Sequence, residues 1–119
     1  MTRLLVVDDE PDIRYLYAAE LEEEGYQVET AGNAAEAVER LQRKDFDLLV
    51  LDIQMKGESG LQLLQKVVRE KKDLPVVLCT AFNCYKDDFS SWLADAYVVK
   101  SSDLTELKDE IRKVLDKRK

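Results

Sequence analysis

The sequence predicts an α/β fold, an open and doubly wound parallel sheet of five strands with helices on both faces. Short apolar runs of strand length alternate with amphipathic helical segments along the whole chain, and such alternation is typical of parallel sheets joined by right-handed crossovers. Four of the five runs are almost continuously apolar, as expected of strands buried on both faces. The chain has 119 residues, which fits one domain. We therefore expect one domain over residues 1–119, with strand order 2-1-3-4-5.

The five expected strands are spaced so that a helix fits between each consecutive pair. They cover residues 4–7, 27–31, 48–51, 76–79 and 97–99. In the second strand, Val28 and Thr30 alternate with Gln27 and Glu29. Alternation of this kind is typical of a half-buried strand. We therefore expect the second strand to form an edge of the sheet.

Five helices are expected between and after these strands. Pro11 suits the first position of a helix that Gly25 ends, and Asn33 with Glu36 resembles a capping box for the second helix. The segment 85–93 is the shortest and has the weakest apolar pattern, and the last helix is expected to begin near Ser102. The apolar positions expected to face the sheet are Ile13, Leu16, Tyr17 and Leu21, then Ala37, Val38 and Leu41, then Leu61, Leu64 and Val68, and finally Leu104, Leu107, Ile111, Val114 and Leu115.

The composition argues against several classes of function. Lys and Arg number 18 against 25 Asp and Glu, a net charge of −7, whereas a nucleic-acid surface needs clustered positive charge. The chain has no histidine, which excludes Ser-His-Asp triads, Cys-His pairs, histidine-ligated zinc and a phosphohistidine on this chain. No apolar run approaches the roughly 20 residues of a membrane span, and the N-terminus lacks the features of a signal peptide. We therefore expect neither a nucleic-acid partner nor a membrane partner.

The two cysteines are too few for a disulfide scaffold or a cysteine-rich metal site. Cys79 lies in an apolar run and is expected in the core, as free cysteines usually are. Cys84 follows a predicted loop and is expected to be a mildly exposed thiol. This use of cysteine is simplest in the reducing cytoplasm.

Polar residues with useful chemistry follow the predicted strands. Asp8 and Asp9 come after the first strand, Asp52 after the third, Thr80 after the fourth and Lys100 after the fifth. The carboxyl ends of parallel strands meet at one edge of the sheet, where such folds bind ligands. Carboxylates brought that close raise one another's pKa unless a cation lies among them. The sequence therefore predicts a Mg²⁺ site that handles phosphate.

An alternative explanation is that the acidic residues 8–10 only cap the helix that follows them, which is ordinary chemistry after a strand. Capping explains any one of these residues as well as a metal site does. It does not explain why Asp52, Thr80 and Lys100 also fall at the ends of strands on the same edge. The whole set therefore favours a functional site.

Four segments together resemble a known protein family. They are residues 4–11, residues 47–55 with Gly57 and Gly60, residues 75–81, and residues 96–100. In their order and spacing they resemble the receiver domain of bacterial and archaeal two-component response regulators, and the resemblance covers the whole chain. It implies a flavodoxin-like (βα)5 fold with Mg²⁺ as cofactor. It also implies a single receiver domain over residues 1–119, with no effector domain in this chain.

The resemblance implies a role for each residue at this edge. Asp52 would be the phosphoacceptor, a carboxylate nucleophile that attacks the phosphoryl group of a kinase phosphohistidine. Asp9 would bind Mg²⁺ directly, with Asp8 acting directly or through water and with Asp52 and the backbone carbonyl of Gln54 completing the protein ligands. Lys100 would pair with Asp52 and then with a phosphoryl oxygen.

The resemblance also implies residues for switching and timing. Thr80 would donate its hydroxyl to a phosphoryl oxygen, and Tyr97 would turn inward as Thr80 moves. Gln54 and Phe82 occupy positions that tune dephosphorylation in the family. Because Phe82 offers no hydrogen bond to an attacking water, we expect a slow to moderate loss of the phosphoryl group.

This sequence departs from the family pattern in three places. Ser101 follows Lys100 where the family usually has proline, and Lys56 stands where proline is common. Only 20 positions separate Thr80 from Lys100, which is shorter than usual, and the shortfall lies around the fourth expected helix. These departures indicate a reshaped switch face.

The implied partners are a sensor histidine kinase or phosphotransfer protein and a downstream target protein. The implied output surface is the fourth helix, fifth strand and fifth helix, which would also form a homodimer. No substrate turnover is expected.

Three alternatives stay open: a pseudo-receiver that binds a partner without phosphotransfer, an aspartate-nucleophile phosphatase, and a flavin carrier. Adjacent Asp8 and Asp9 disfavour the phosphatase, whose two carboxylates lie two positions apart, and the first loop lacks the phosphate cradle of a flavin carrier.

Overall fold

The computed structural model describes residues 2–55, 58–80, 94–100 and 103–117. Its main sheet has five parallel strands in the order β2-β1-β3-β6-β7. This order confirms the predicted 2-1-3-4-5 arrangement and places β2 at an edge, as expected. The strands are β1 (Arg3–Val7), β2 (Gln27–Ala31), β3 (Leu48–Leu51), β6 (Val76–Thr80) and β7 (Ala96–Val99).

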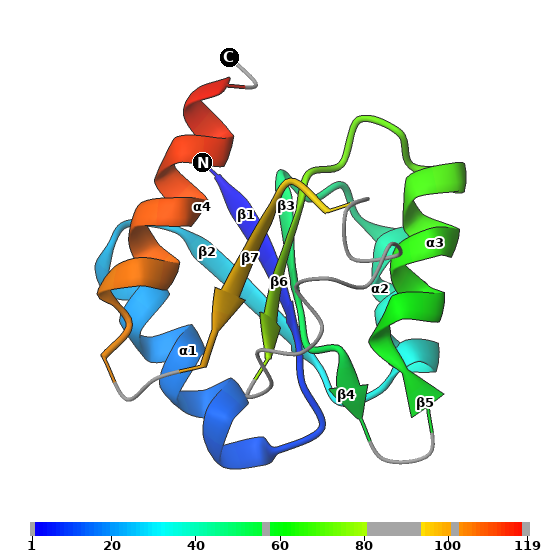
Figure 1. Cartoon of the computed structure of the whole chain (residues 1–119), viewed down its shortest axis with the longest axis horizontal. Coiled ribbons are helices and arrows are strands. Elements are labelled where there is room, and N and C mark those ends of the chain that lie inside the picture. The colour runs from blue at the N-terminus through cyan, green and yellow to red at the C-terminus, as the bar shows by residue number, and fades with distance from the viewer. Residues whose placement is uncertain (1, 56–57, 81–93, 101–102, 118–119) are drawn as a thin grey trace.

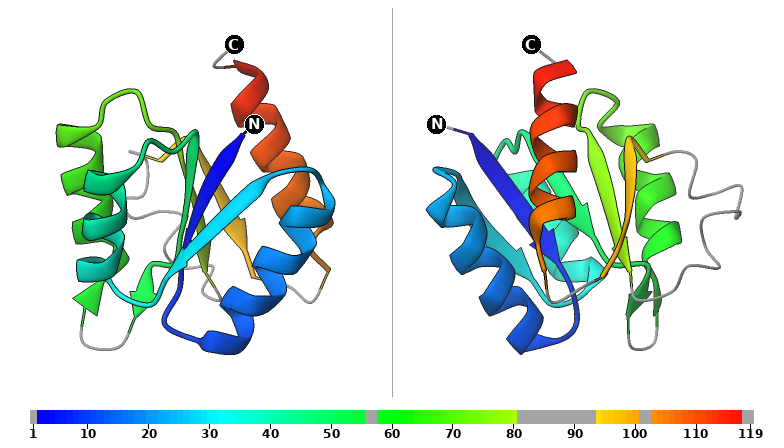
Figure 2. Two further views of the ribbon diagram at one scale, coloured as in Figure 1. Left: turned by 180° about the vertical axis from the view of Figure 1, so that it is seen from behind. Right: turned by 60° about the vertical axis from the view of Figure 1, so that its left-hand side comes forward.

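Helices cover both faces of the sheet. Helices α1 (Pro11–Glu23) and α4 (Thr105–Lys117) lie on one face, and α2 (Ala34–Arg43) and α3 (Gly60–Glu70) lie on the other (Figure 1; Figure 2). Successive strand residues point to opposite faces of the sheet and so enter different halves of the core. Leu4 packs with α1 and α4, whereas Leu5 packs with α2 and α3. The predicted helix over residues 85–93 lies outside the described residues.

The apolar helix faces agree with the sequence pattern except at a few positions. Leu16 was predicted to face the sheet, but it is 41% exposed, so this prediction is wrong. In α3 the buried positions include Leu63 and Val67, whereas Leu61 and Val68 are only partly buried. The last helix begins at Thr105 rather than near Ser102. For the helix faces, the 3.6-residue period admits adjacent apolar positions such as Leu16 and Tyr17 or Val67 and Val68, and only packing selects between them.

The helix ends follow the predicted chemistry. Asn33 caps α2, because its Oδ1 accepts a hydrogen bond from the Glu36 N–H at 2.8 Å. The Glu36 carboxylate in turn accepts from the N–H of Gly32 at 3.0 Å, one residue earlier than in a standard capping box. Gly25 adopts φ +97° just after α1, a conformation that glycine tolerates and other residues rarely adopt.

A small antiparallel sheet that the sequence did not predict follows β3. It pairs β4 (Gln54–Met55) with β5 (Glu58–Ser59) and leads directly into α3. At the start of α3, the Gly60 N–H donates to the Ile53 carbonyl at 2.6 Å. A Cβ at Gly60 would collide with the carbonyl oxygen of Asp52, so this crossing next to Asp52 requires glycine.

Within the described part of the chain, every helix is too short or too polar to span a membrane.

Candidate functional site

The carboxyl edge of the sheet brings Asp8 and Asp52 side by side. Val6 and Val50 are paired in the register of β1 and β3, and the two aspartates lie two residues further along each strand. The ladder continues to them, because the Asp8 N–H donates to the Ala31 carbonyl at 3.1 Å and the Asp52 N–H donates to the Val7 carbonyl at 3.0 Å. Their side chains therefore lie on the same face of the sheet as α1 and α4.

Lys100 joins the two carboxylates. Its Nζ lies 2.6 Å from Asp8 Oδ2 and 3.3 Å from Asp52 Oδ2. Asp8 and Asp52 are 2% and 4% exposed and are the only buried polar or charged side chains among the described residues. Buried charges need partners of opposite sign, and Lys100 supplies one to both. The sequence predicted the contact with Asp52, whereas the shorter contact with Asp8 was not predicted.

The environment of Lys100 keeps its amine protonated. Burial by itself lowers the pKa of a lysine, but here the hydrogen bond with Asp8 and the negative charges of Asp52 and Asp8 act in the opposite direction and prevail. The pKa of Lys100 is therefore raised above its usual value. A permanently charged ammonium group at this position is suited to holding an anionic group next to Asp52.

The loop after β1 supplies the carboxylates for a cation site. Asp8, Asp9 and Glu10 each offer a carboxylate oxygen, and these atoms lie within 4.8 Å of one another. Hard divalent cations such as Mg²⁺ prefer oxygen ligands of this type, so the donor set fits the metal predicted from the sequence. The alternative that Glu10 caps α1 is not supported, because Glu10 is the N-cap residue and makes no side-chain cap hydrogen bond.

The remaining predicted site residues lie in strands β4, β6 and β7 or outside the described residues. Tyr97 lies in β7, is half-buried, and packs against the core on the side of α2 and α3. Thr80 ends β6 and pairs with Val99, and Gln54 opens β4 just beyond Asp52. Phe82, Cys84, Lys56 and Ser101 lie outside the described residues.

Next to the site, two core side chains, Tyr17 and Cys79, make a contact that the sequence does not predict. Cys79 is in the core as predicted, and the Tyr17 hydroxyl lies 3.4 Å from its Sγ. The registers of β3 and β6 place Cys79 in the same cross-strand row as Asp52. Burial raises the pKa of the Cys79 thiol to about 11 and raises that of Tyr17 further. Both groups are therefore neutral at physiological pH.

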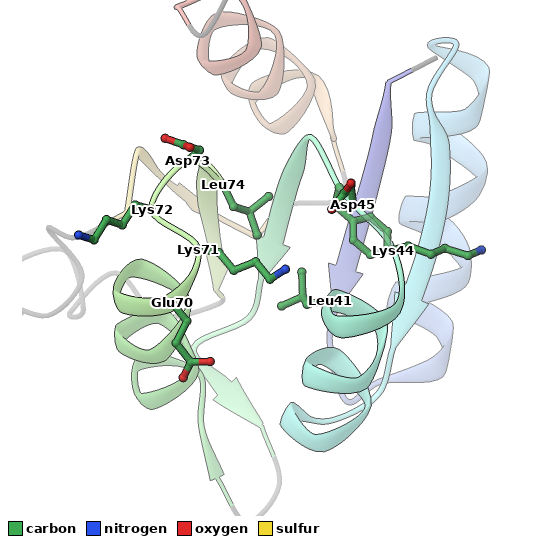
Figure 3. A pocket seen from close by; sticks show the side chains of 9 residues that line it. Leu41, Lys44, Asp45, Glu70, Lys71, Lys72, Asp73 and Leu74 are labelled. Carbon is green, nitrogen blue, oxygen red and sulfur yellow. The ribbon is translucent and has the colours of Figure 1, made fainter.

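A cavity at the opposite edge of the sheet does not form a comparable site. It encloses about 330 Å³ between the ends of α2 and α3. Figure 3 shows Lys44 and Lys72 pointing away from it, while Leu41 and Leu74 face inward. It adjoins the amino ends of β3 and β6, whereas open α/β sheets bind ligands at the carboxyl ends. The candidate site is therefore the edge that holds Asp8, Asp52 and Lys100.

Comparisons with curated proteins connect this geometry to a family. The sequence model described as the response regulator receiver domain matches residues 4–112. The chain is 35% identical over 114 residues to the probable transcriptional regulatory protein TcrX of Mycobacterium tuberculosis, covering 94% of this chain and 49% of TcrX. It is 30% identical over 117 residues to the response regulator ArlR of Staphylococcus aureus, covering 97% and 53%. The chain thus spans about half the length of these relatives.

Solved structures agree with the sequence relatives. The response regulator TrrA of Thermotoga maritima, solved with Mg²⁺-BeF, matches with a TM-score of 0.93 and 48% identity over 96% of this chain and 99% of that one. A structure of the histidine kinase ThkA in complex with TrrA matches with a TM-score of 0.91 and 49% identity, over 97% and 99%. A receiver domain from Methanospirillum hungatei gives 0.93 and 29%, over 99% and 96%. Together with the matched family model and the observed strand order, these likenesses show that the chain belongs to the response regulator receiver domain family.

Proposed function

We propose that this chain accepts a phosphoryl group on Asp52 from a phosphohistidine of a sensor histidine kinase or phosphotransfer protein. The observation that carries the proposal is the bridge from Lys100 Nζ to the buried carboxylates of Asp8 and Asp52 at the carboxyl edge of the sheet. This bridge supports the proposal because it holds a positive charge against the carboxylate that would act as the nucleophile.

The proposed step forms one bond and breaks another. A carboxylate oxygen of Asp52 attacks phosphorus, the bond from phosphorus to the histidine nitrogen breaks, and the electron pair stays on the imidazole, which is then protonated. The Lys100 ammonium stabilises the charge that builds up on the phosphoryl oxygens, and Thr80 donates its hydroxyl to another of them. The product is an acyl phosphate, which hydrolyses readily and makes the modification reversible.

Mg²⁺ is the proposed cofactor of this step. Asp8, Asp9, Asp52 and the backbone carbonyl of Gln54 would hold it, with Asp9 as a direct ligand. When bound, the ion supplies positive charge that lets the anionic phosphoryl group approach the anionic carboxylate. The proposal is supported by the clustered carboxylates of residues 8–10 and by the Mg²⁺-BeF in TrrA.

The exposed face of α1 is the proposed contact for the kinase. Tyr15 and Leu16 are the large hydrophobic side chains that are exposed among the described residues, at 79% and 41%. They lie in the first two turns of α1, which follows the acidic loop of residues 8–10. An exposed apolar pair at this place suits a partner helix that presents a histidine. The complex of TrrA with a histidine kinase supports a partner of this class.

The output is proposed to pass to a downstream protein. Phosphorylation would shift Thr80 and Tyr97 between two arrangements. It would change the surface made by the predicted fourth helix, β7 and α4, through which a homodimer would also form. Phe82 and Gln54 would set the lifetime of the phosphoryl group. The chain would turn over no separate substrate, and we place its action in the cytoplasm.

Intact mass spectrometry after incubation with Mg²⁺ and acetyl phosphate tests the proposal. We expect the wild-type chain to gain one phosphoryl group and Asp52→Asn or a chelated sample to gain none. Asp73→Asn, an exposed carboxylate at the opposite edge, is the matched control and should be modified like the wild type. A folded wild-type chain that gains no phosphoryl group would contradict the proposal and favour the pseudo-receiver alternative.

A further inference from the structure

Arg14 lies in the first turn of α1 and reaches back to the end of β1. Its Nη1 donates to the backbone carbonyl of Asp8 at 2.6 Å. The guanidinium lies against Gly32 in the turn after β2, where an added Cβ would lie 2.9 Å from Nη1 and 3.3 Å from Cζ. A side chain at position 32 would therefore push the guanidinium away, so Gly32 provides the space that Arg14 occupies.

The hydrogen bond from Arg14 completes the fixation of Asp8. The other polar groups of Asp8 are held by three different segments. Its N–H donates to the Ala31 carbonyl at 3.1 Å, its Oδ1 accepts from the Glu10 N–H at 2.9 Å, and its Oδ2 contacts Lys100 at 2.6 Å. Arg14 therefore holds the one remaining group, the backbone carbonyl.

That carbonyl belongs to the peptide that joins Asp8 to Asp9. A peptide is planar, so a donor that fixes its oxygen also fixes the N–H and the Cα of Asp9. The direction in which Asp9 leaves the backbone is thus set in part by Arg14. Asp9 is the proposed direct ligand of Mg²⁺, which makes this direction important for binding.

We propose that Arg14, held in place by the space at Gly32, is a positioning residue that orients Asp9 for the divalent cation. The inference rests on the proposed function, because that function assigns Asp9 to the metal. Arg14 has a second, opposite effect through its charge, since a cation beside the acidic loop repels Mg²⁺. Loss of charge alone would tighten Mg²⁺ binding, whereas loss of positioning would weaken it. The sign of the change therefore separates the two effects.

The test is an NMR titration of ¹⁵N-labelled protein with Mg²⁺. We expect Arg14→Gln to weaken Mg²⁺ binding about tenfold, as is usual when a residue that orients a metal ligand is removed. Gly32→Ala should weaken it similarly by displacing the guanidinium. Gly32 is not among the described glycines with positive φ, so alanine adds no backbone strain there. Arg43→Gln is the control, because Arg43 is exposed on α2 and pairs with Glu39.

The double variant makes the test stricter. If Gly32 acts only through Arg14, then Arg14→Gln combined with Gly32→Ala should bind Mg²⁺ no more weakly than either single variant. Unchanged or tighter binding in both single variants would overturn the inference. Urea unfolding of each variant checks that it is folded.

A second readout needs no metal. The Asp9 N–H shares a peptide with the Asp8 carbonyl, so its amide resonance should shift in Arg14→Gln and Gly32→Ala and stay in place in Arg43→Gln. An unmoved Asp9 amide would overturn the inference whatever the affinity for Mg²⁺. A wild-type chain that binds no Mg²⁺ would instead contradict the proposed function, so the two failures are distinguishable.

Discussion

Lys100 lies between two buried carboxylates and can neutralise the charge of only one. Asp8, Asp52 and Lys100 therefore carry a net negative charge, and Asp9 and Glu10 add to it at the rim. Buried and crowded negative charge is costly unless a cation relieves it. The same excess of negative charge that makes the site unfavourable by itself favours the binding of a divalent cation there.

At the scale of single residues, the buried thiol of Cys79 predicts a loss of stability in alkaline solution. Burial raises its pKa from about 9 to about 11, so the folded chain keeps a proton that the unfolded chain loses. The contribution is fully present below pH 9 and is lost as the pH rises toward 11, by roughly 2–3 kcal/mol. Urea unfolding curves across this range measure it.

Two variants make this prediction specific. Cys79→Val removes the titrating thiol at similar volume and should make the pH dependence shallower, although the raised pKa of Tyr17 leaves part of it. Tyr15→Phe removes an exposed hydroxyl and should leave the curve unchanged. An equally steep loss of stability in Cys79→Val would show that the thiol is not its source.

Some residues of the site could be predicted from the sequence and others could not. Asp8, Asp52 and Lys100 each follow a strand, and strand ends meet at one edge, so the fold class alone brings them together. The contacts of Arg14 with Asp8 and Gly32 depend on a side-chain direction and on the packing of two loops. No periodicity or motif in the sequence predicts that side-chain direction or that loop packing. The Tyr17–Cys79 contact likewise joins residues 62 positions apart.

At the scale of elements, the cap of α2 predicts a measurable loss of stability. Asn33 accepts a hydrogen bond from the Glu36 N–H at 2.8 Å, and removing such a cap costs about 1 kcal/mol. We expect Asn33→Ala to lower the free energy of unfolding by this amount in urea. Gln42→Ala, at an exposed position of the same helix, should change it by less than about 0.5 kcal/mol. Equal effects would mean that the cap contributes nothing specific.

Elements with a clear period were predicted well and elements without one were missed. The strands at 27–31 and 48–51 have the predicted bounds, because runs of alternating or continuous apolar residues mark them. The sequence does not predict the β4–β5 pair because two-residue strands show no period. Leu16 was misplaced because helical spacing allowed it to share the buried stripe with Tyr17, and α1 turns only Tyr17 fully inward.

At the scale of the whole molecule, the topology was predictable because few arrangements satisfy right-handed crossovers between five parallel strands. The structure has the predicted order, and this order brings β1 and β3 together. Adjacent β1 and β3 in turn place Asp8 beside Asp52. The location of the site is thus a consequence of the fold, whereas the fine positioning of its ligands is a consequence of packing.

The net charge of −7 predicts how the whole chain responds to cations. A ligand that binds only the folded state at a hundredfold excess over its Kd stabilises it by about 2.7 kcal/mol. For a domain of this size that raises the Tm by roughly 10 °C. Calorimetry with Mg²⁺ measures the shift. Sodium chloride at the same ionic strength controls for screening of the general repulsion among the carboxylates.

The two sources of stabilisation differ in what they require. Screening acts on all charges, so it should raise the Tm of the wild type and of Asp9→Asn alike, and sodium should produce it as well as Mg²⁺ does. Binding at the edge of the sheet needs Asp9 beside Asp8 and Asp52, so the larger part of the Mg²⁺ effect should disappear in Asp9→Asn. An equal rise in both proteins, or with both salts, would assign the whole effect to screening and leave the acidic edge without a specific cation.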